Sequence, residues 1–154
     1  MNSFNYRDAK SGDEKQVLNL IQVVLLDYQL TLEPQGADKD VTDIKSNYID
    51  NYGWFQVVEN NEKIIGSVGI YKVNNDECEL RKMYIYPEYH GQGIGSTLMK
   101  NALQKAKALG FKTMTLQTNS VLKKALPLYQ KYGFTIDESI EVCSRCDIAM
   151  KCSL

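Results

Sequence analysis

The most informative segment lies in the middle of the chain and reads ELRKMYIYPEYHGQGIGS, residues 79–96. Its first half predicts a strand that ends at Pro87, and its second half sets three glycines directly before a predicted helix. Glycine lets the backbone turn tightly and come close to a ligand. The first N–H groups of a helix have no partner within it, so with the helix dipole they form an anion site, most often for phosphate. The segment therefore predicts a phosphate-binding loop; a tight connection without a ligand is the alternative.

The spacing of the glycines argues against two common classes of phosphate ligand, nucleoside triphosphates and dinucleotides. It does not follow the GxxxxGK[ST] pattern of a nucleoside-triphosphate loop. It also does not follow GxGxxG after a first N-terminal strand, the pattern of dinucleotide-binding folds. The loop instead follows several predicted strands in mid-chain, so a nucleotide-binding domain is the weaker interpretation.

Predicted strands and helices surround this loop in a mixed order. Strands are expected at residues 4–7, 54–59, 63–71, 77–86, 113–118, 133–136 and 140–150. Helices are expected from a capping box at 11–14 to about residue 28, at 41–51, from the glycine loop to 109, and at 121–131, with a polar loop at 29–43. Antiparallel hairpins come first and a strand–helix–strand–helix–strand unit follows. We therefore expect an α/β (α+β) fold with a mixed sheet flanked by helices.

Length and composition are those of an ordinary globular chain. The 154 residues predict a single domain, 1–154, and 18 basic against 19 acidic residues leave a net charge of −1. Such a balanced chain has no electrostatic reason to bind nucleic acid or an anionic membrane. No apolar run approaches the ~18 residues of a membrane span, and the first residues lack a signal-peptide pattern. We expect a cytoplasmic protein.

The four cysteines cluster late in the chain and do not resemble a disulfide framework. Cys143 and Cys146 form a CxxC pair inside the predicted strand 140–150, where positions three apart point to opposite faces. The only histidine, His90, is distant in sequence, so a zinc site lacks a second pair of ligands. We expect buried, unpaired thiols and no metal; metal or redox chemistry is the alternative.

Two ordered motifs together resemble the GNAT superfamily of N-acetyltransferases. Residues 79–87 followed by 90–95 are similar to its acyl-CoA-binding motif, [QR]-x-x-G-x-[GA] after a strand. Its second signature, N…A…LY-x-K-x-G-F, is similar to Asn119, Ala125, Leu128, Tyr129, Lys131, Gly133 and Phe134. The resemblance covers about residues 78–136 and departs at His90, where the family usually has Arg or Gln. It implies a mostly antiparallel twisted sheet with a splayed central parallel pair of strands.

The resemblance also implies acetyl-CoA as co-substrate. The amides of residues 92–96 would hold its pyrophosphate, the backbone of 83–85 would pair with the pantetheine arm, and Asn119 would bond the pantetheine amides. The residues implied in binding are Met83, Tyr84, Ile85, His90, Gly91, Gln92, Gly93, Ile94, Gly95, Ser96 and Asn119. A backbone N–H of the strand would also stabilise the developing oxyanion.

Tyr129 is the candidate general acid. A phenol, with a reference pKa of about 10, can donate a proton to a departing thiolate whose thiol titrates near 8.5. Pro127 lies two residues earlier and would kink or restart the helix, which could aim Tyr129 into the cleft. The alternative is that Tyr129 only packs its helix on the sheet.

Glu79 is the candidate general base, because an attacking amine is protonated in water and must lose a proton directly or through a water molecule. Some family members carry a glutamate at the matching position. Residues 79, 81, 83 and 85 share one face of an ideal strand, and a bulge would shift that. The alternatives are an exposed carboxylate or an ion pair with Arg81. The remaining candidates for a base are Asp76, Glu77, Tyr84 and Tyr86.

The function implied is acetyl transfer from acetyl-CoA to a primary amine of a small molecule, an amino acid or a peptide. A non-catalytic CoA-binding sensor or regulatory module is the alternative. Carboxylates in the loop 29–43 would suit a cationic acceptor or simply be solvated, whereas Arg145 could hold an acceptor carboxylate. The resemblance allows a homodimer.

Overall fold

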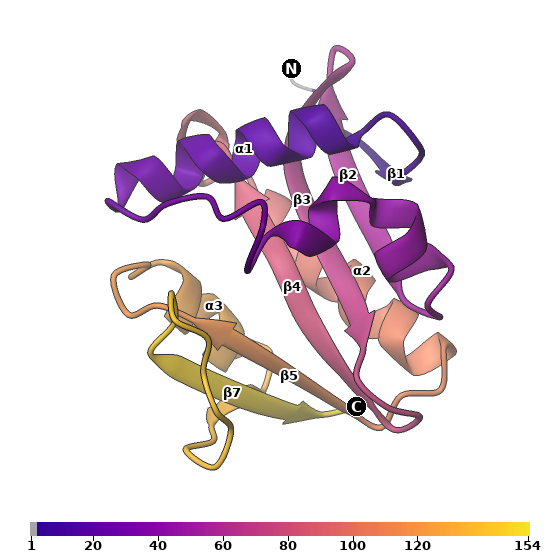
Figure 1. Ribbon diagram of the computed structural model, residues 1–154, viewed down its shortest axis with the longest axis vertical. Coiled ribbons are helices and arrows are strands. Elements are labelled where there is room, and N and C mark those ends of the chain that lie inside the picture. The colour runs from indigo at the N-terminus through magenta and orange to yellow at the C-terminus, as the bar shows by residue number, and fades with distance from the viewer. Residues whose placement is uncertain (1–2) are drawn as a thin grey trace.

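The computed structural model describes residues 3–154 and contains one seven-stranded sheet in the order β1-β2-β3-β4-β5-β7-β6 (Figure 1). The strands are β1 Asn5–Asp8, β2 Trp54–Asn60, β3 Lys63–Lys72, β4 Glu77–Ile85, β5 Thr113–Thr118, β6 Thr135–Ile136 and β7 Ile148–Ser153. β4 and β5 pair in parallel, and the other neighbours within residues 3–154 pair antiparallel. The mixed sheet expected from the sequence is confirmed.

Helices cover both faces of the sheet. They are α1 Glu14–Asp27, α2 Ile94–Ala108 and α3 Ala125–Lys131, with short turns η1 Lys39–Thr42, η2 Lys45–Ile49 and η3 Pro87–Tyr89. α1 and the η1–η2 segment lie on one face and α2 lies on the other (Figure 1). α1 buries Val17, Leu20, Ile21, Val24 and Leu25, a helical repeat, against the sheet. Within the described residues, no helix is both long and apolar enough to cross a membrane.

The central strands part after a short parallel ladder. β4 and β5 pair from Glu77 opposite Thr113 to Leu80 opposite Leu116. β4 then continues to Ile85 and β5 to Thr118 without pairing to each other, and the two strands diverge in Figure 1. The edge of β4 that faces β5 beyond Leu80 is therefore free of strand partners.

A β-bulge interrupts β4 just where the two strands part. Arg81 lies opposite Gly69 and Tyr84 opposite Ser67, so two residues of β4 face one residue of β3. Lys82 takes a φ of 54°, a left-handed conformation that non-glycine residues rarely adopt, and its carbonyl accepts a 2.6 Å hydrogen bond from Ser67 Oγ. Side chains change face across a bulge. Residues 83 and 85 therefore do not share the face of Glu79 and Arg81, unlike in an ideal strand.

Three local expectations are wrong. Residues 140–147 form a loop, and the last strand is Ile148–Ser153. α3 begins at Ala125, because residues 119–124 form turns instead of helix. The capping box at 11–14 does not form, because α1 begins at Glu14 itself and the residue before it, Asp13, makes no side-chain cap hydrogen bond.

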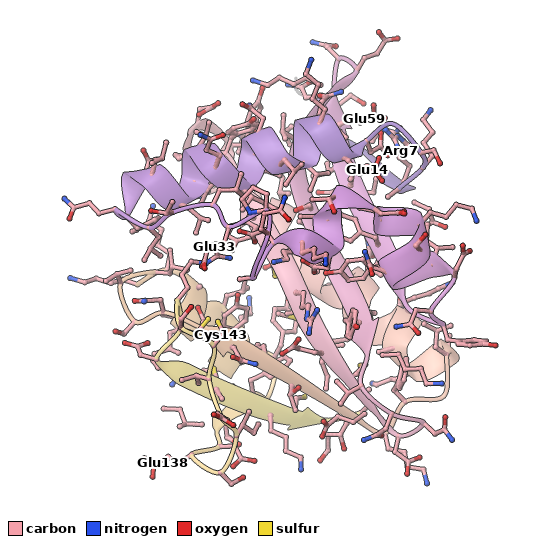
Figure 2. All side chains as sticks on the ribbon, viewed as in Figure 1. Arg7, Glu14, Glu33, Glu59, Glu138 and Cys143 are labelled. Carbon is pink, nitrogen blue, oxygen red and sulfur yellow. The ribbon has the colours of Figure 1, made fainter. Side chains whose placement is uncertain are left out.

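The carboxylate of Asp13 is bound by Arg7 of β1 instead of the first N–H groups of α1. The guanidinium of Arg7 binds Asp13 at 2.8 Å on one side and Glu59 of β2, also at 2.8 Å, on the other. Figure 2 shows Arg7, Glu14 and Glu59 together at this end of the molecule. Charge-assisted hydrogen bonds from Arg7 thus tie β1 to the start of α1 and to β2.

Candidate active site

A cavity of about 340 Å³ opens where β4 and β5 separate. Its volume lies in the range of ligand-binding pockets. Among the residues that line it are Glu79, Arg81, Lys82, Met83, Tyr84, Gln117, Asn119, Tyr129, Cys143, Arg145 and Cys146. Five of the residues assigned to catalysis or acetyl-CoA binding from the sequence therefore line one cavity, namely Glu79, Met83, Tyr84, Asn119 and Tyr129.

Tyr129 reaches this cavity from α3. The residue is 8% exposed and its ring packs edge-on against Phe134, with ring centroids 6.1 Å apart. Among the described residues, its hydroxyl has no hydrogen-bond partner. Burial, with a contribution from nearby Cys146, raises the pKa of the phenol to about 12. Tyr129 therefore stays protonated at neutral pH and can donate to a ligand.

Glu79 is held between two neighbours. One carboxylate oxygen accepts a hydrogen bond from Arg81 Nε, and the other accepts one from Gln117 Nε2 at 3.1 Å. Glu79 is only 8% exposed, so of the two alternatives to the base role the exposed carboxylate is wrong, while the ion pair with Arg81 is present. The carboxylate is oriented at the cavity wall, with part of its charge balanced by Arg81.

Asn119 lies just beyond β5, and its side-chain amide makes two hydrogen bonds within the protein. Its Nδ2 donates to the carbonyl oxygen of Arg145 at 3.0 Å, and its Oδ1 accepts from the N–H of Val121 at 3.0 Å. A side-chain amide carries two N–H donors. One N–H of Asn119 is therefore left for a ligand in the cavity.

The glycine loop lies outside the cavity, at the start of α2. Gly91 and Gly93 have φ values of 79° and 82°, where a side chain would be strained. Gly93 precedes the first helical residue, Ile94, and no side chain caps the helix. A Cβ on Gly95 would lie 3.4 Å from Leu128 Cδ2, so α3 packs against this end of α2 next to Tyr129. The uncapped amides of α2 are therefore available to an anion near the cavity.

His90 and Ile85 belong to this loop region as well. His90 Nε2 lies 3.2 Å from the carbonyl oxygen of Ile85, and it must carry the proton because a carbonyl only accepts. Ile85 does not line the cavity; its side chain lies beside Gly95, 3.5 Å from where a Cβ would be. The imidazole of His90 thus links the glycine loop to β4 through the carbonyl of Ile85.

The acidic loop 29–43 is fastened to the cavity wall by Asp38. This carboxylate is fully buried and accepts two hydrogen bonds from Arg145, at 2.6 and 2.9 Å, and one from Lys82 at 2.7 Å. Burial alone would raise the pKa of Asp38, but Arg145 and the charge of Lys82 outweigh it and hold the pKa at about 2. Asp38 is therefore not a solvated surface charge, and the guanidinium of Arg145 is bound to Asp38 within the protein.

Cys143 and Cys146 lie in the loop before β7. Figure 2 shows Cys143 on the side of this loop that faces Glu33. Cys143 is exposed and Cys146 is half-buried, and their sulfur atoms are 3.0 Å apart. The expectation of buried thiols on opposite faces of a strand is wrong for this pair, because the segment is a turn. Among residues 3–154, no group of three or more His, Cys, Asp or Glu could hold a metal ion.

Two polar residues that line this cavity, Gln117 and Lys82, were given no role by the sequence reasoning, whereas Asp40 comes from the acidic loop 29–43 that it proposed for the acceptor. The alternation of side chains along β5 could have indicated Gln117, which lies in β5 two residues before Asn119. Lys82 had no comparable signal, since it reaches the cavity through the bulge in β4.

Comparisons with known proteins agree on one family. The model of the Acetyltransferase (GNAT) family matches residues 21–134. The uncharacterized N-acetyltransferase YjgM of Escherichia coli K12 is 30% identical over 147 residues, which cover 92% of this chain and 86% of that protein.

Solved structures share the fold at low sequence identity. An acetyltransferase of the GNAT family from Staphylococcus aureus Mu50 superposes with a TM-score of 0.90 at 18% identity, covering 98% of this chain and 99% of that one. A GNAT superfamily phosphinothricin acetyltransferase from Sinorhizobium meliloti, solved with acetyl-CoA, gives a TM-score of 0.76 at 20% identity, covering 98% and 88%.

Proposed function

Because this chain belongs to the GNAT family and is an N-acetyltransferase, we propose that it transfers the acetyl group of acetyl-CoA to a primary amine by direct attack. Tyr129 acts as general acid and Glu79 as general base. The observation that carries the proposal is the cavity between the splayed strands, which Tyr129 lines together with Met83 and Tyr84 of β4. The amine belongs to a small molecule, an amino acid or a peptide.

The binding of acetyl-CoA uses two sets of backbone groups. The uncapped amides from Ile94 to Ser96, with the positive end of α2, suit the pyrophosphate. The edge of β4 at residues 83–85 can pair with the amides of the pantetheine arm, as an added strand would, and one of its N–H groups can stabilise the developing oxyanion. Asn119 has one N–H left for the same arm. Acetyl-CoA is the ligand of the Sinorhizobium meliloti structure, which supports this choice of co-substrate.

Tyr129 supplies the proton for the departing thiolate. Its hydroxyl is protonated at neutral pH, because burial raises the pKa of the phenol to about 12. A buried phenol that makes no protein hydrogen bond keeps its donor free for a ligand. Proton donation in the transition state by a positioned group contributes roughly 10²–10⁴-fold to a rate.

Glu79 receives the proton of the attacking amine, directly or through a water molecule. Arg81 and Gln117 fix the direction of its carboxylate at the cavity wall. A general base must lie within hydrogen-bond reach of the proton that it takes, directly or through one water molecule. Arg145 is already bound to Asp38, so it is not the residue that would hold a carboxylate of the acceptor.

The test incubates the protein with acetyl-CoA and a panel of amines and follows the release of free thiol. Amine-dependent thiol release, with the acetylated amine found by mass spectrometry, is the expected result. Calorimetry with acetyl-CoA runs in parallel. Tight acetyl-CoA binding without thiol release for any amine would support a CoA-binding sensor and contradict the proposal.

A further inference from the structure

Cys143 and Cys146 form a close dithiol at the wall of the cavity. Their sulfur atoms are 3.0 Å apart, and the N–H of Cys146 donates to the carbonyl oxygen of Cys143 at 3.0 Å, which closes a turn. We propose that this pair is a modification site that takes a low-molecular-weight disulfide as its oxidant and closes into a Cys143–Cys146 disulfide. The exposed face of Cys143 gives the oxidant access.

The local structure allows this bond with little movement. A disulfide is about 2.05 Å long, so the two sulfur atoms must approach by about 1 Å. Both thiols lie in a loop, and no strand ladder has to break when they move. The other cysteines, Cys78 and Cys152, are buried in the core and are not exposed to an oxidant.

The chemistry runs in two thiol–disulfide exchanges. The Cys143 thiolate attacks one sulfur of the oxidant RSSR, forms the mixed disulfide Cys143–S–SR and releases RS⁻. Cys146 then loses its proton to water and attacks the Cys143 sulfur, which breaks the mixed disulfide and releases the second RS⁻. The two thiols are oxidised by two electrons, and RSSR is reduced to two RSH. Burial, together with Cys143, raises the pKa of Cys146 to about 12, so Cys146 stays protonated in the reduced protein and the exposed Cys143 makes the first attack.

Closing the bond acts on the candidate active site through two hydrogen bonds. The N–H of Cys143 donates to Gln117 Oε1 at 2.7 Å, and Gln117 in turn donates to Glu79. The carbonyl of Arg145, inside the ring that the disulfide closes, accepts from Asn119. Oxidation therefore shifts the hydrogen-bond partners of Gln117, which orients the candidate base Glu79, and of Asn119, which is proposed to bind the pantetheine arm. This effect on turnover rests on the proposed function, whereas formation of the bond does not.

The position of Arg145 makes the bond easy to detect. Trypsin cleaves after Arg145 and separates Cys143, in peptide 132–145, from Cys146, in peptide 146–151. The reduced protein is treated with glutathione disulfide, its free thiols are alkylated, and it is digested without reductant. The expected result is one linked species, two hydrogens lighter than the two peptides, that dithiothreitol separates. Variants Cys78→Ser and Cys152→Ser should give the same species.

Three outcomes would overturn the proposal: both peptides fully alkylated, a stable mixed disulfide on Cys143 alone, or oxidation at Cys78 or Cys152 instead. The mass readout needs no acetyl transfer, so it stands even if the proposed function fails. In the turnover assay, oxidation should slow the wild type and Cys152→Ser by roughly ten- to a hundredfold, since a misplacement of about 1 Å can cost a site two orders of magnitude. Cys143→Ser, compared with its own untreated form, should not respond. If the disulfide-linked species forms but turnover is unchanged, the proposed effect of the disulfide on the active site is contradicted.

Discussion

At the scale of single residues, Tyr129 offers the most direct test, because its ring packs while its hydroxyl stays free. Tyr129→Phe removes only that hydroxyl and keeps the contact with Phe134. If the hydroxyl protonates the thiolate, turnover should fall by roughly 10²–10⁴-fold, with nearly unchanged acetyl-CoA affinity. Steady-state and single-turnover kinetics, with calorimetry for acetyl-CoA, measure the two effects.

A matched control lies three residues further along the same segment. Tyr132 caps the end of α3 and does not line the cavity, so Tyr132→Phe should leave turnover close to that of the wild type. A normal single-turnover rate in Tyr129→Phe, with only a small change in stability, would assign Tyr129 a packing role.

Glu79 requires a different test, because its carboxylate also balances Arg81. Glu79→Gln keeps the shape and removes the proton acceptor, so the acetyl-transfer rate should fall by roughly 10²–10⁴-fold if Glu79 is the base. Glu77→Gln, two residues earlier on β4 and outside the cavity, serves as control and should keep its rate.

Urea unfolding of both Glu variants separates chemistry from structure. The base assignment fails if Glu79→Gln loses stability but transfers acetyl groups at the rate of the wild type.

At the scale of elements, the glycine loop makes α2 the anion-binding helix of the proposal. Gly93 has open space around its Cβ position and a φ of 82°, and Gly110 beyond the other end of α2 has open space and a φ of 92°. Gly93→Glu sets a negative charge where the pyrophosphate is proposed to bind, so acetyl-CoA affinity should collapse. Gly110→Glu carries a similar backbone strain away from the site and should retain affinity.

Calorimetry with acetyl-CoA on both variants measures this difference, and circular dichroism checks that each remains folded. Equal loss of affinity in both glycine variants would point to backbone strain as the cause. Unchanged affinity in Gly93→Glu would contradict the proposed pyrophosphate site at the start of α2.

At the scale of the whole molecule, Asp38 joins parts of the chain that are far apart in sequence. It binds Lys82 on β4 and Arg145 before β7, and it accepts a hydrogen bond from the N–H of Glu33 in its own loop. Asp38→Asn leaves two buried cations short of a partner and should lower the free energy of unfolding by roughly 3–5 kcal/mol. Asp50→Asn, which removes an exposed ion pair with Lys45, should barely change it. Urea titrations measure both, and equal effects would contradict the structural role of Asp38.

The same carboxylate predicts a dependence on pH. The pKa of Asp38 is lowered from 3.8 to about 2 in the folded chain. A lowered pKa contributes stability above the unfolded value, and this contribution is lost as the pH falls from about 4 to about 2. The expected loss is about 2 kcal/mol, at ~1.4 kcal/mol per pKa unit. Urea titrations between pH 2 and 6 should show this component in the wild type and not in Asp38→Asn.

The local features of the molecule could be predicted from the sequence. The strand, glycine loop and helix at 79–96 were predicted in order, because neighbouring residues set the turn and the helix start. The helix expected to run to about residue 28 is α1, and the order of strands and helices indicated a mixed sheet. The resemblance to acetyltransferases rested on these same short motifs.

Tertiary structure alone decided which side chains meet. The bond from Arg145 to Asp38 spans 107 residues, and it exists because the sheet order sets β7 beside β5 and the loop before η1 above them. The left-handed Lys82 has no sequence signal, since the bulge comes from pairing with β3. Cys143 and Cys146 face each other because the chain turns where the pattern suggested a strand. Local conformation depends on adjacent residues, whereas these contacts depend on the free energy of packing the whole sheet.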